Sequence, residues 1–370
     1  MISLYKLKRE INRIQLQILG VFSFYTDKIK ALFYDRNWKN LIQLSDGSNQ
    51  SNSNKYAIFV IYQKISIAAS IFETCNDLLR KNYKVLIISN ASINSSDIFQ
   101  LRKYVWRICI RPNFGYDFGA YRDGIRLLVE WKISPDRLIM MNDSIWFPLN
   151  SDKEDISNME LLPLDVVCLQ EYIPLNRLGQ SRINKKKYYG SFFYMFQNSV
   201  LKEKKFIHFW INYQLTNNKY RTIKTGEIKL SQTFEELNFS CIALFSNQTF
   251  INHLPNFENH DLLIILNDLV VEESSLVLRI ASLQSNFDSS NADEYKLKII
   301  QLIVECVYRA NILTTASIPL LRFYNVNFLK KTNEIMTSKL LSKIQQAIKS
   351  NAISIDNKFI IDEILNRGSR

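Results

Sequence analysis

The sequence has little of several residues that mark particular protein classes. With 9 glycines and 7 prolines in 370 residues, collagen-like and glycine/proline-rich disordered chains are excluded. The five cysteines are scattered without a CxxC pair, which argues against a zinc site or a disulfide framework and is typical of a reducing cytoplasm. No apolar run approaches the ~20 residues that a membrane-spanning helix needs. The composition therefore predicts a globular protein on the cytoplasmic side of the membrane.

The chain is rich, by contrast, in apolar and basic residues. Hydrophobic residues make up 47% and charged residues 22%, as is ordinary for a globular protein with a large core. The formal net charge of +12 points to nucleic acid, an anionic membrane surface or phosphate-bearing substrates as partners. No helix-turn-helix, zinc-finger, RRM or KH signature accompanies the basic residues, which are spread along the chain. Nucleic-acid binding is therefore kept only as an alternative, and nucleic acid is not predicted among the partners.

Residues 1–54 are expected to form a basic helical segment and a linker. Apolar residues recur there at helical spacing, with basic residues on the other side: Leu4, Leu7, Ile11, Ile14 and Ile18 against Lys6, Lys8, Arg9 and Arg13. Two interpretations stand, a helix packed on its own domain or an interfacial helix on anionic lipid. The apolar run Ile18–Phe24 is short and has no cleavage site after it, so it fits a signal peptide poorly. The polar segment 45–54 is taken as the domain boundary.

Strands and helices are expected to alternate through residues 55–260. Strand-like runs occur at Tyr56–Tyr62, Val85–Ser89, Val105–Ile110, Arg137–Met141, Asp165–Leu169 and Ser191–Phe196, and helical spacing at Ile65–Lys81, Ser96–Tyr104, Gly119–Trp131, Leu201–Tyr213 and Ile228–Glu236. This order predicts an α/β domain with a mostly parallel sheet and helices on both faces. Ligands of such sheets bind beyond the carboxyl ends of the strands. Residues 261–370 have mainly helical spacing and are expected to form a C-terminal helical region.

The segment 111–122 (RPNFGYDFGAYR) follows the third of these strands and carries two of the nine glycines. Glycine lets the backbone approach a ligand, and the amides that open a helix favour a diphosphate. Arginine side chains add charge-assisted contacts, and an aspartate accepts hydrogen bonds from sugar hydroxyls. The predicted donor-binding residues are Arg111, Asn113, Gly115, Asp117, Gly119 and Arg122. The alternative is a plain helix-opening turn capped by Asn113 or Asp117.

A second polar segment, Asn142-Asp143-Ser144, follows the fourth strand. Mg²⁺ and Mn²⁺ prefer oxygen ligands and often share them with substrate phosphates, so Asp143 is a candidate metal ligand. All three residues are also predicted to bind the donor. The alternative is an Asx-turn that ends the strand.

Together the two segments resemble the rhamnan synthesis F family of bacterial polysaccharide glycosyltransferases. Its members carry an R-x-N-x-G-x-D-x-G-A segment followed by N-D-S at the end of a strand, matched here at 111–120 and 142–144. The resemblance covers residues 55–260, with a weaker similarity at Ile318–Phe323. It implies a GT-A-like fold and a nucleotide-diphosphate sugar donor, rhamnose or another deoxysugar among the candidates. The implied acceptor is a lipid-linked oligosaccharide of a surface polysaccharide or lipopolysaccharide.

The resemblance also implies candidates for catalysis and metal binding. Related enzymes have a D-x-D metal motif at this place, whereas this chain has Ile145 two residues after Asp143, so a divalent metal (Mg²⁺ or Mn²⁺) is left open. His253 is a further candidate metal ligand, and an ordinary surface histidine is the alternative. An inverting transfer needs a carboxylate base. Glu227, expected at a helix start, is the first candidate and Glu171 the second; a carboxylate that merely favours the helix dipole is the alternative to the first. A non-catalytic assembly partner remains the competing function.

Overall fold

The computed structural model divides into two compact units. The residues that it describes are 25–49, 51–182, 185–285, 292–309, 311–331 and 337–367. Unit 1 comprises the described residues up to Asp143 together with Ile156–Gln170 and Tyr188–Leu244. Unit 2 comprises Ser144–Asp155, Glu171–Lys187 and the described residues from Phe245 onward.

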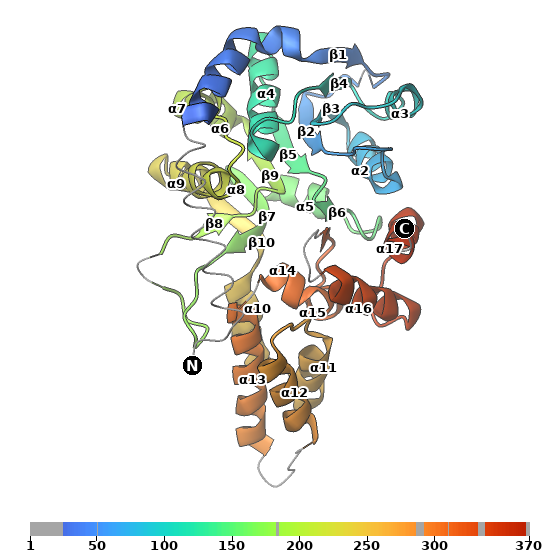
Figure 1. The fold of residues 1–370 in the computed structure, drawn as a ribbon, viewed down its shortest axis with the longest axis vertical. Helices are drawn as coiled ribbons and strands as arrows, with labels where there is room; N and C mark the ends of the chain where they lie inside the picture. The colour runs from blue at the N-terminus through green and yellow to red at the C-terminus, as the bar shows by residue number, and fades with distance from the viewer. Residues whose placement is uncertain are drawn as a thin grey trace. The chain divides into compact units, whose positions relative to one another are not determined.

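Unit 1 is built on a sheet whose strands follow the order β1-β4-β3-β2-β5-β9-β7-β10, with β8 added beside β7 (Figure 1). The central strands are parallel: β4 (Arg107–Ile110), β3 (Tyr83–Ser89), β2 (Lys55–Ile61) and β5 (Arg137–Asn142). Antiparallel pairs join β1 (Gln43–Asp46) to β4, and β9 (Phe193–Gln197) to both β5 and β7 (Val166–Tyr172). The remaining strands are β8 (Tyr188–Tyr189) and β10 (Cys241–Ser246). The predicted α/β class with a mostly parallel central sheet is confirmed.

Both faces of the sheet are covered. Successive side chains of a strand point to opposite faces, and both sets are buried in β2. Ile58 and Val60 of β2 belong to the core cluster that also contains Phe118 and Tyr121 of α4 (Tyr116–Glu130). Ala57, Phe59 and Ile61 alternate with them and are equally buried. Strands buried on both faces read as continuous apolar runs, which is why the sequence pattern identified them.

The connections place a topological switch point between β2 and β5. From β2 the chain passes through α2 (Ala69–Arg80) to β3 and through α3 (Ser95–Leu101) to β4 on one side. It then returns through α4 and adds β5 on the other side of β2. Ligand crevices of open α/β sheets lie outside the carboxyl ends of the strands at such a point. The ends of β2 and β5 are therefore the place to look for a site.

Several predicted boundaries differ from those in the structure. The helix expected at Gly119–Trp131 begins three residues earlier, so Tyr116–Arg122 forms the first turns of α4. The helix expected at Leu201–Tyr213 is divided into α6 (Asn198–Lys202) and α7 (Lys204–Ile211). The segment 45–54, taken as a linker, contributes to β1, and Gly47 N–H donates to the Trp106 carbonyl at 2.8 Å. Residues 1–24, which include all the apolar and basic residues named for the predicted N-terminal helix, lie outside the described residues, and residues 25–41 are helical.

Unit 2 is mainly helical in the residues that the structure describes. Its helices are α10 (Asn247–His253), α11 (Asn259–Asp268), α12 (Ser274–Ser285), α13 (Ala292–Arg309), α14 (Ile312–Thr315), α15 (Ser317–Phe323), α16 (Thr337–Lys349) and α17 (Lys358–Asn366). A small ribbon pairs β6 (Ile145–Trp146) with β11 (Leu329–Lys330). Trp146 lies in a core cluster with Leu340 and Ile360. Across the described parts of the chain, no helix has the length and apolar character that a membrane span requires.

Candidate functional site

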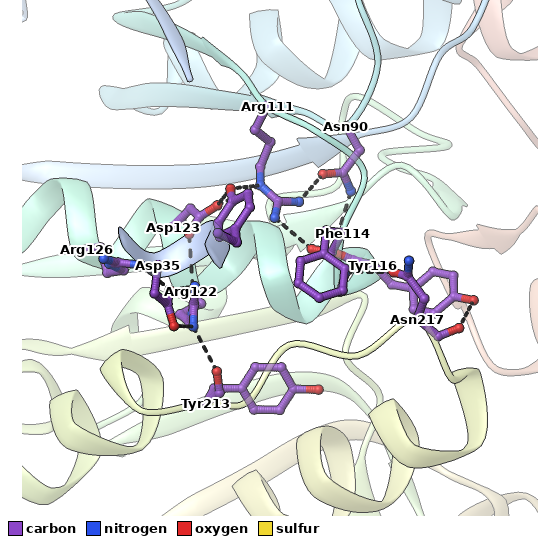
Figure 2. A network of polar contacts seen from close by, with 12 residues as sticks. Asp35, Asn90, Arg111, Phe114, Tyr116, Arg122, Asp123, Arg126, Tyr213 and Asn217 are labelled. Atoms are coloured by element: carbon purple, nitrogen blue, oxygen red, sulfur yellow. Dashed lines mark hydrogen bonds and ion pairs between the residues drawn. The ribbon is translucent and has the colours of Figure 1, made fainter. Parts of the chain in front are cut away.

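Arg111, at the end of β4, is enclosed within unit 1 (Figure 2). Its Nε donates to Asp123 Oδ2 at 2.6 Å and to the Tyr34 hydroxyl at 3.1 Å. Its other nitrogens donate to Asn90 Oδ1 at 2.6 Å and to the Phe114 carbonyl at 2.7 Å. Burial is the largest influence and would lower the pKa of Arg111, but the charges and hydrogen bonds of Asp123 and Tyr34 together outweigh burial, so the pKa is raised. The guanidinium is thus occupied inside the fold, which favours a positioning role over contact with a diphosphate.

Arg122 has a similar environment. It is 1% exposed, and its guanidinium donates to Asp35 and, at 3.0 Å, to the Tyr213 carbonyl (Figure 2). Asp35 comes from helix 25–41 and also pairs with Arg126 at 2.9 Å. The charge of Arg122 is therefore used to join this helix to α4. Sequence reasoning missed Asp35 and Asp123 because each lies outside the segment's recognisable pattern.

Gly115 and Gly119 are required because other parts of the same polypeptide pack closely against them. Gly115 has φ +86°, and a Cβ on it would lie 2.8 Å from Leu215 Cδ2. A Cβ on Gly119 would lie 2.3 Å from the Phe114 carbonyl oxygen. Gly115 N–H donates to Asn217 Oδ1 at 3.1 Å, and the Tyr116 hydroxyl donates to the Asn217 carbonyl at 2.7 Å (Figure 2). These contacts hold the turn that opens α4, next to the exposed Asn113.

The two predicted segments meet through Asp117 and Asn142. Asp117 is half-buried in the first turn of α4, and Asn142 is the last residue of β5. Asn142 Nδ2 donates to Asp117 Oδ2 at 2.9 Å. The structure therefore brings together residues that lie 25 positions apart in the sequence.

Asp143 lies at the switch point itself. Its backbone N–H donates to the Val60 carbonyl near the end of β2 at 2.9 Å. Its carboxylate Oδ2 accepts from the Tyr62 N–H at 2.9 Å and from Gln63 Nε2 at 2.5 Å. A turn at Asp143 and Ser144 follows the strand, and the partly exposed Asp143 carboxylate is held at the carboxyl edge of β2 and β5 by Tyr62 and Gln63 from the loop after β2.

Tyr121 connects Asp117 and Asp143 with Glu227. It is fully buried one turn after Asp117 on α4, and its hydroxyl donates to the Ser191 carbonyl at 2.8 Å. The pKa of Tyr121 is raised well above its ordinary value, by burial first, then by the charge of Asp117, and also by Glu227 and Asp143; a hydrogen bond with Asn142 acts in the opposite direction. One phenol thus lies within the field of all three carboxylates. The sequence alone did not single out Tyr121; its position four residues after Asp117, on the same side of α4, is the signal that could have found it.

Glu227 belongs with Asp117 and Asp143 to the carboxylates around Tyr121. The sequence predicts that it begins a helix, and the structure differs on this point. Glu227 lies in a π-helical turn (η1, Ile223–Ile228) between α8 (Lys219–Thr222) and α9 (Lys229–Glu236). Ser191 Oγ donates to Glu227 Oε1. π-Helical turns inside α-helices are frequent at functional sites. The half-buried Glu227 carboxylate is therefore oriented by a serine that the sequence had not singled out.

The other predicted residues belong to unit 2. Ser144 Oγ accepts from Lys330 Nζ at 2.7 Å, and its carbonyl accepts from Lys331 N–H at 2.7 Å. Glu171, near the end of β7, pairs with Lys187 Nζ at 2.7 Å. His253 ends α10, and its ring stacks on Tyr324 with 5.8 Å between the centroids. Each of these side chains has a partner within its own unit.

A site for a divalent metal needs several oxygen or nitrogen ligands close together. Among the described residues, no three His, Cys, Asp or Glu side chains are grouped so that they could hold an ion. The hydrogen bonds from Tyr62 N–H and Gln63 Nε2 to Asp143 are both accepted by Oδ2. One carboxylate that shares Mg²⁺ with substrate phosphates is a common arrangement, and Asp143 fits that arrangement, whereas a cage of protein ligands does not.

The strand order and the carboxylate cluster define an α/β protein with a candidate ligand site at a topological switch point. A family model described as "Rhamnan synthesis protein F" matches residues 85–366. The chain belongs to the rhamnan synthesis protein F family, and the resemblance predicted from its motifs is confirmed.

Two curated proteins and one solved structure are similar to parts of the chain. "Uncharacterized protein y4gN" of Sinorhizobium fredii (strain NBRC 101917 / NGR234) is 32% identical over 258 residues, which cover 70% of this chain and 66% of that protein. "Virulence protein VirA" of Vibrio anguillarum is 28% identical over 123 residues, 32% of this chain and 40% of that protein. The glycosyltransferase GlyE of Streptococcus pneumoniae TIGR4 aligns with a TM-score of 0.32 and 7% identity, over 83% of this chain and 66% of that chain. The chain thus spans about two thirds of y4gN and less of VirA.

Proposed function

We propose that the protein is a glycosyltransferase that moves a sugar from a nucleotide-diphosphate donor to a growing bacterial surface polysaccharide. The observation that carries the proposal is the hydrogen bond between Asn142 and Asp117, which joins the two family segments beside Asp143 at the switch point. Membership of a family named for rhamnan synthesis supports polysaccharide assembly, and rhamnose or another deoxysugar as the transferred sugar. A lipid-linked oligosaccharide is the acceptor we favour.

Donor binding is assigned to Asp117, Asn142 and Asp143. The carboxylate of Asp117 accepts hydrogen bonds well from sugar or ribose hydroxyls, because charged acceptors form stronger hydrogen bonds than neutral ones. A bound divalent metal would neutralise the donor's diphosphate as a Lewis acid, and Asp143 is the residue that would hold it together with phosphate oxygens. Arg111 and Arg122 support the site indirectly, because their charges are balanced by Asp123 and Asp35.

Glu227 is proposed as the base of an inverting transfer. The acceptor oxygen forms a bond to the anomeric carbon while the bond from that carbon to the phosphate oxygen breaks, and the nucleoside diphosphate leaves. The acceptor's proton passes to the Glu227 carboxylate. The contact from Ser191 Oγ to Glu227 Oε1 orients the carboxylate that would accept the proton. Glu171 is the less favoured base because Lys187 holds its carboxylate in an ion pair.

The experiment that tests this function is a transfer assay. The full chain is incubated with uridine- and deoxythymidine-diphosphate sugars and with lipid-linked acceptor, with and without Mn²⁺, and nucleoside diphosphate and elongated acceptor are measured. We expect both products in equal amounts with at least one donor. Donor binding without transfer would instead favour a non-catalytic assembly partner. Binding of random DNA that weakens with salt, without donor binding, would contradict the proposal in favour of a nucleic-acid protein.

A further inference from the structure

Helix 25–41 has two faces of different character. Its inner face is buried against unit 1 through Ala31, Tyr34 and Trp38, which belong to the core cluster that includes Leu128 of α4. In Figure 1 this helix, in blue, lies beside α4. The spacing of three and four residues is that of one side of an α-helix. The helix is therefore an integral part of the domain.

Polar contacts on the inner side fix the helix further. Asp27 Oδ2 accepts from Thr216 Oγ1 at 2.6 Å and from Asn217 N–H at 3.2 Å. Asp35 accepts from Arg122 and Arg126. These two aspartates are the acidic residues of the helix, and both are engaged with unit 1. The helix is thus held in a fixed orientation relative to Asp117 and Arg122 on α4.

The outer face, which we define as Ile29, Leu32, Phe33 and Arg36, is exposed. The exposed fractions are 69% for Ile29, 72% for Leu32 and 65% for Phe33. These positions are three, four and seven residues apart, so they lie together on one side of the helix, opposite Ala31, Tyr34 and Trp38. Large apolar side chains gathered on a surface, unlike scattered ones, mark an interaction site.

The charges around the outer face are positive. Lys30, Arg36 and Lys39 are exposed on this helix, and Lys39 also pairs with Glu130. Of the helix's two acidic side chains, Asp27 is buried, and Asp35, 42% exposed, is paired with Arg122 and Arg126. An apolar centre with basic residues around it is complementary to a membrane surface, where apolar side chains enter the acyl boundary and basic side chains meet anionic headgroups.

We propose that the outer face of helix 25–41 binds the surface of an anionic lipid membrane. The helix lies in the plane of the interface, and its inner face transmits that orientation to the domain that carries Asp117 and Asp143. This inference goes beyond sugar transfer and does not depend on it. A second copy of the chain is the competing occupant, and the test separates the two.

The test measures binding of the full chain to sedimented vesicles of phosphatidylglycerol mixed with phosphatidylcholine, and of phosphatidylcholine alone. The variant carries Ile29→Gln, Leu32→Gln and Phe33→Gln together. A matched control replaces three exposed apolar residues on other segments of unit 1: Ile65→Gln, Phe99→Gln and Leu161→Gln, whose exposed fractions are 86%, 68% and 80%. We expect the wild type and the control to bind the anionic vesicles and the variant to bind at least about tenfold more weakly. Added salt should weaken the wild type's binding, because basic side chains contribute to it.

Two results would overturn the proposal. The first is equal binding of anionic vesicles by variant and wild type. The second is a wild type that sediments as a dimer and a variant that is monomeric with unchanged vesicle binding, because the outer face then joins two copies. A melting temperature and a donor affinity equal to those of the wild type show that the variant is folded. Vesicle binding requires no donor or acceptor, so its failure leaves the proposed sugar transfer untouched, and the reverse holds as well.

Discussion

Arg111 and Asp123 form an ion pair whose two side chains are both fully buried, at 2.6 Å. A pair of this kind adds little net stability compared with apolar residues, because both charges lose their hydration. Removing one partner is far more costly, because the other charge remains buried without compensation. Tyr34, Asn90 and Phe114 complete the arginine's hydrogen bonds, so the loss extends to three further groups.

We therefore expect Arg111→Met to lower the free energy of unfolding of unit 1 by about 3–5 kcal/mol. The measurement is urea denaturation followed by near-ultraviolet circular dichroism. Lys229→Met, which breaks the exposed pair with Glu236, is the control and should cost at most about 1 kcal/mol. If Arg111→Met is as stable as the wild type and only donor binding is impaired, Arg111 contacts the donor directly and the positioning role is wrong.

Glu227→Gln tests the proposed base. The substitution keeps the shape of the side chain and can retain the contact with Ser191, but it cannot accept a proton from the acceptor. General-base catalysis contributes about 10²–10⁴-fold, so kcat should fall by that factor while the donor's dissociation constant stays nearly constant. Steady-state transfer rates and donor titrations measure the two quantities.

Glu171→Gln is the paired control and should retain its turnover. Loss of activity in Glu171→Gln with an active Glu227→Gln would move the base to Glu171. If both variants stay active, neither carboxylate is the base and the inverting mechanism is wrong.

The sequence predicted the carboxylates of the cluster better than their supporting contacts. Asp117 and Asp143 could be identified because each follows a strand in a recognisable local segment. The burial of Arg111 and Arg122 could not be predicted, because it depends on Asp123 and on Asp35 from helix 25–41. Charge pairing between distant segments leaves no periodic signal in either of them.

At the scale of elements, α4 is shaped by the close approach of its first turns to the preceding loop. The Gly119 N–H donates to the Gly115 carbonyl at 2.8 Å, and the Phe114 carbonyl occupies the space in which a Cβ of Gly119 would lie. A larger residue must displace backbone here, whereas at Gly124 the nearest atoms belong to the buried side chain of Ile58, 2.8 Å away.

We expect Gly119→Ala to lower the free energy of unfolding by about 1–3 kcal/mol, as is typical of overpacking. Donor affinity should fall with it, because the displaced turn carries Asp117. Gly124→Ala should cost less, because its closest contact is with side-chain atoms at 2.8 Å and not with a backbone oxygen at 2.3 Å. Urea denaturation and donor titration of both variants provide the comparison. An equal loss of unfolding free energy in the two variants would contradict the argument that contact with the Phe114 backbone makes Gly119→Ala the more costly substitution.

The helix that contains Glu227 shows where sequence periodicity fails. Apolar spacing predicted a helix from Ile228, and α9 begins at Lys229, close to that position. The six-residue π-helical turn before it was not predicted, because the insertion of a residue does not alter the apolar pattern on either side. Gly226, within this turn, packs closely against α4, because a Cβ on it would be 2.9 Å from Phe118.

At the scale of the molecule, alternating strands and helices predicted the parallel centre of the sheet. They did not predict the antiparallel pairs, because the apolar pattern of a buried strand is the same whether its neighbour is parallel or antiparallel. β9 lies between β5 and β7, antiparallel to both, and the loop before it supplies Ser191. The arrangement of Asp117, Asp143 and Glu227 therefore depends on the order of the strands as much as on the two sequence motifs. Strand order is a property of the whole sheet.

The proposed sugar transfer depends most on a donor site at the carboxyl ends of β2 and β5. Calorimetric titration of nucleotide-diphosphate sugars into the full chain tests this site most directly, with Asp117→Asn, Asp143→Asn and, as a control on the exposed β1 edge, Asp46→Asn. A hydrogen bond to a charged group is worth about 1.5–3 kcal/mol, so each of the first two variants should weaken donor binding about tenfold or more. Asp46→Asn should bind as the wild type does. Unchanged affinity in both Asp117→Asn and Asp143→Asn would contradict the assignment of the site.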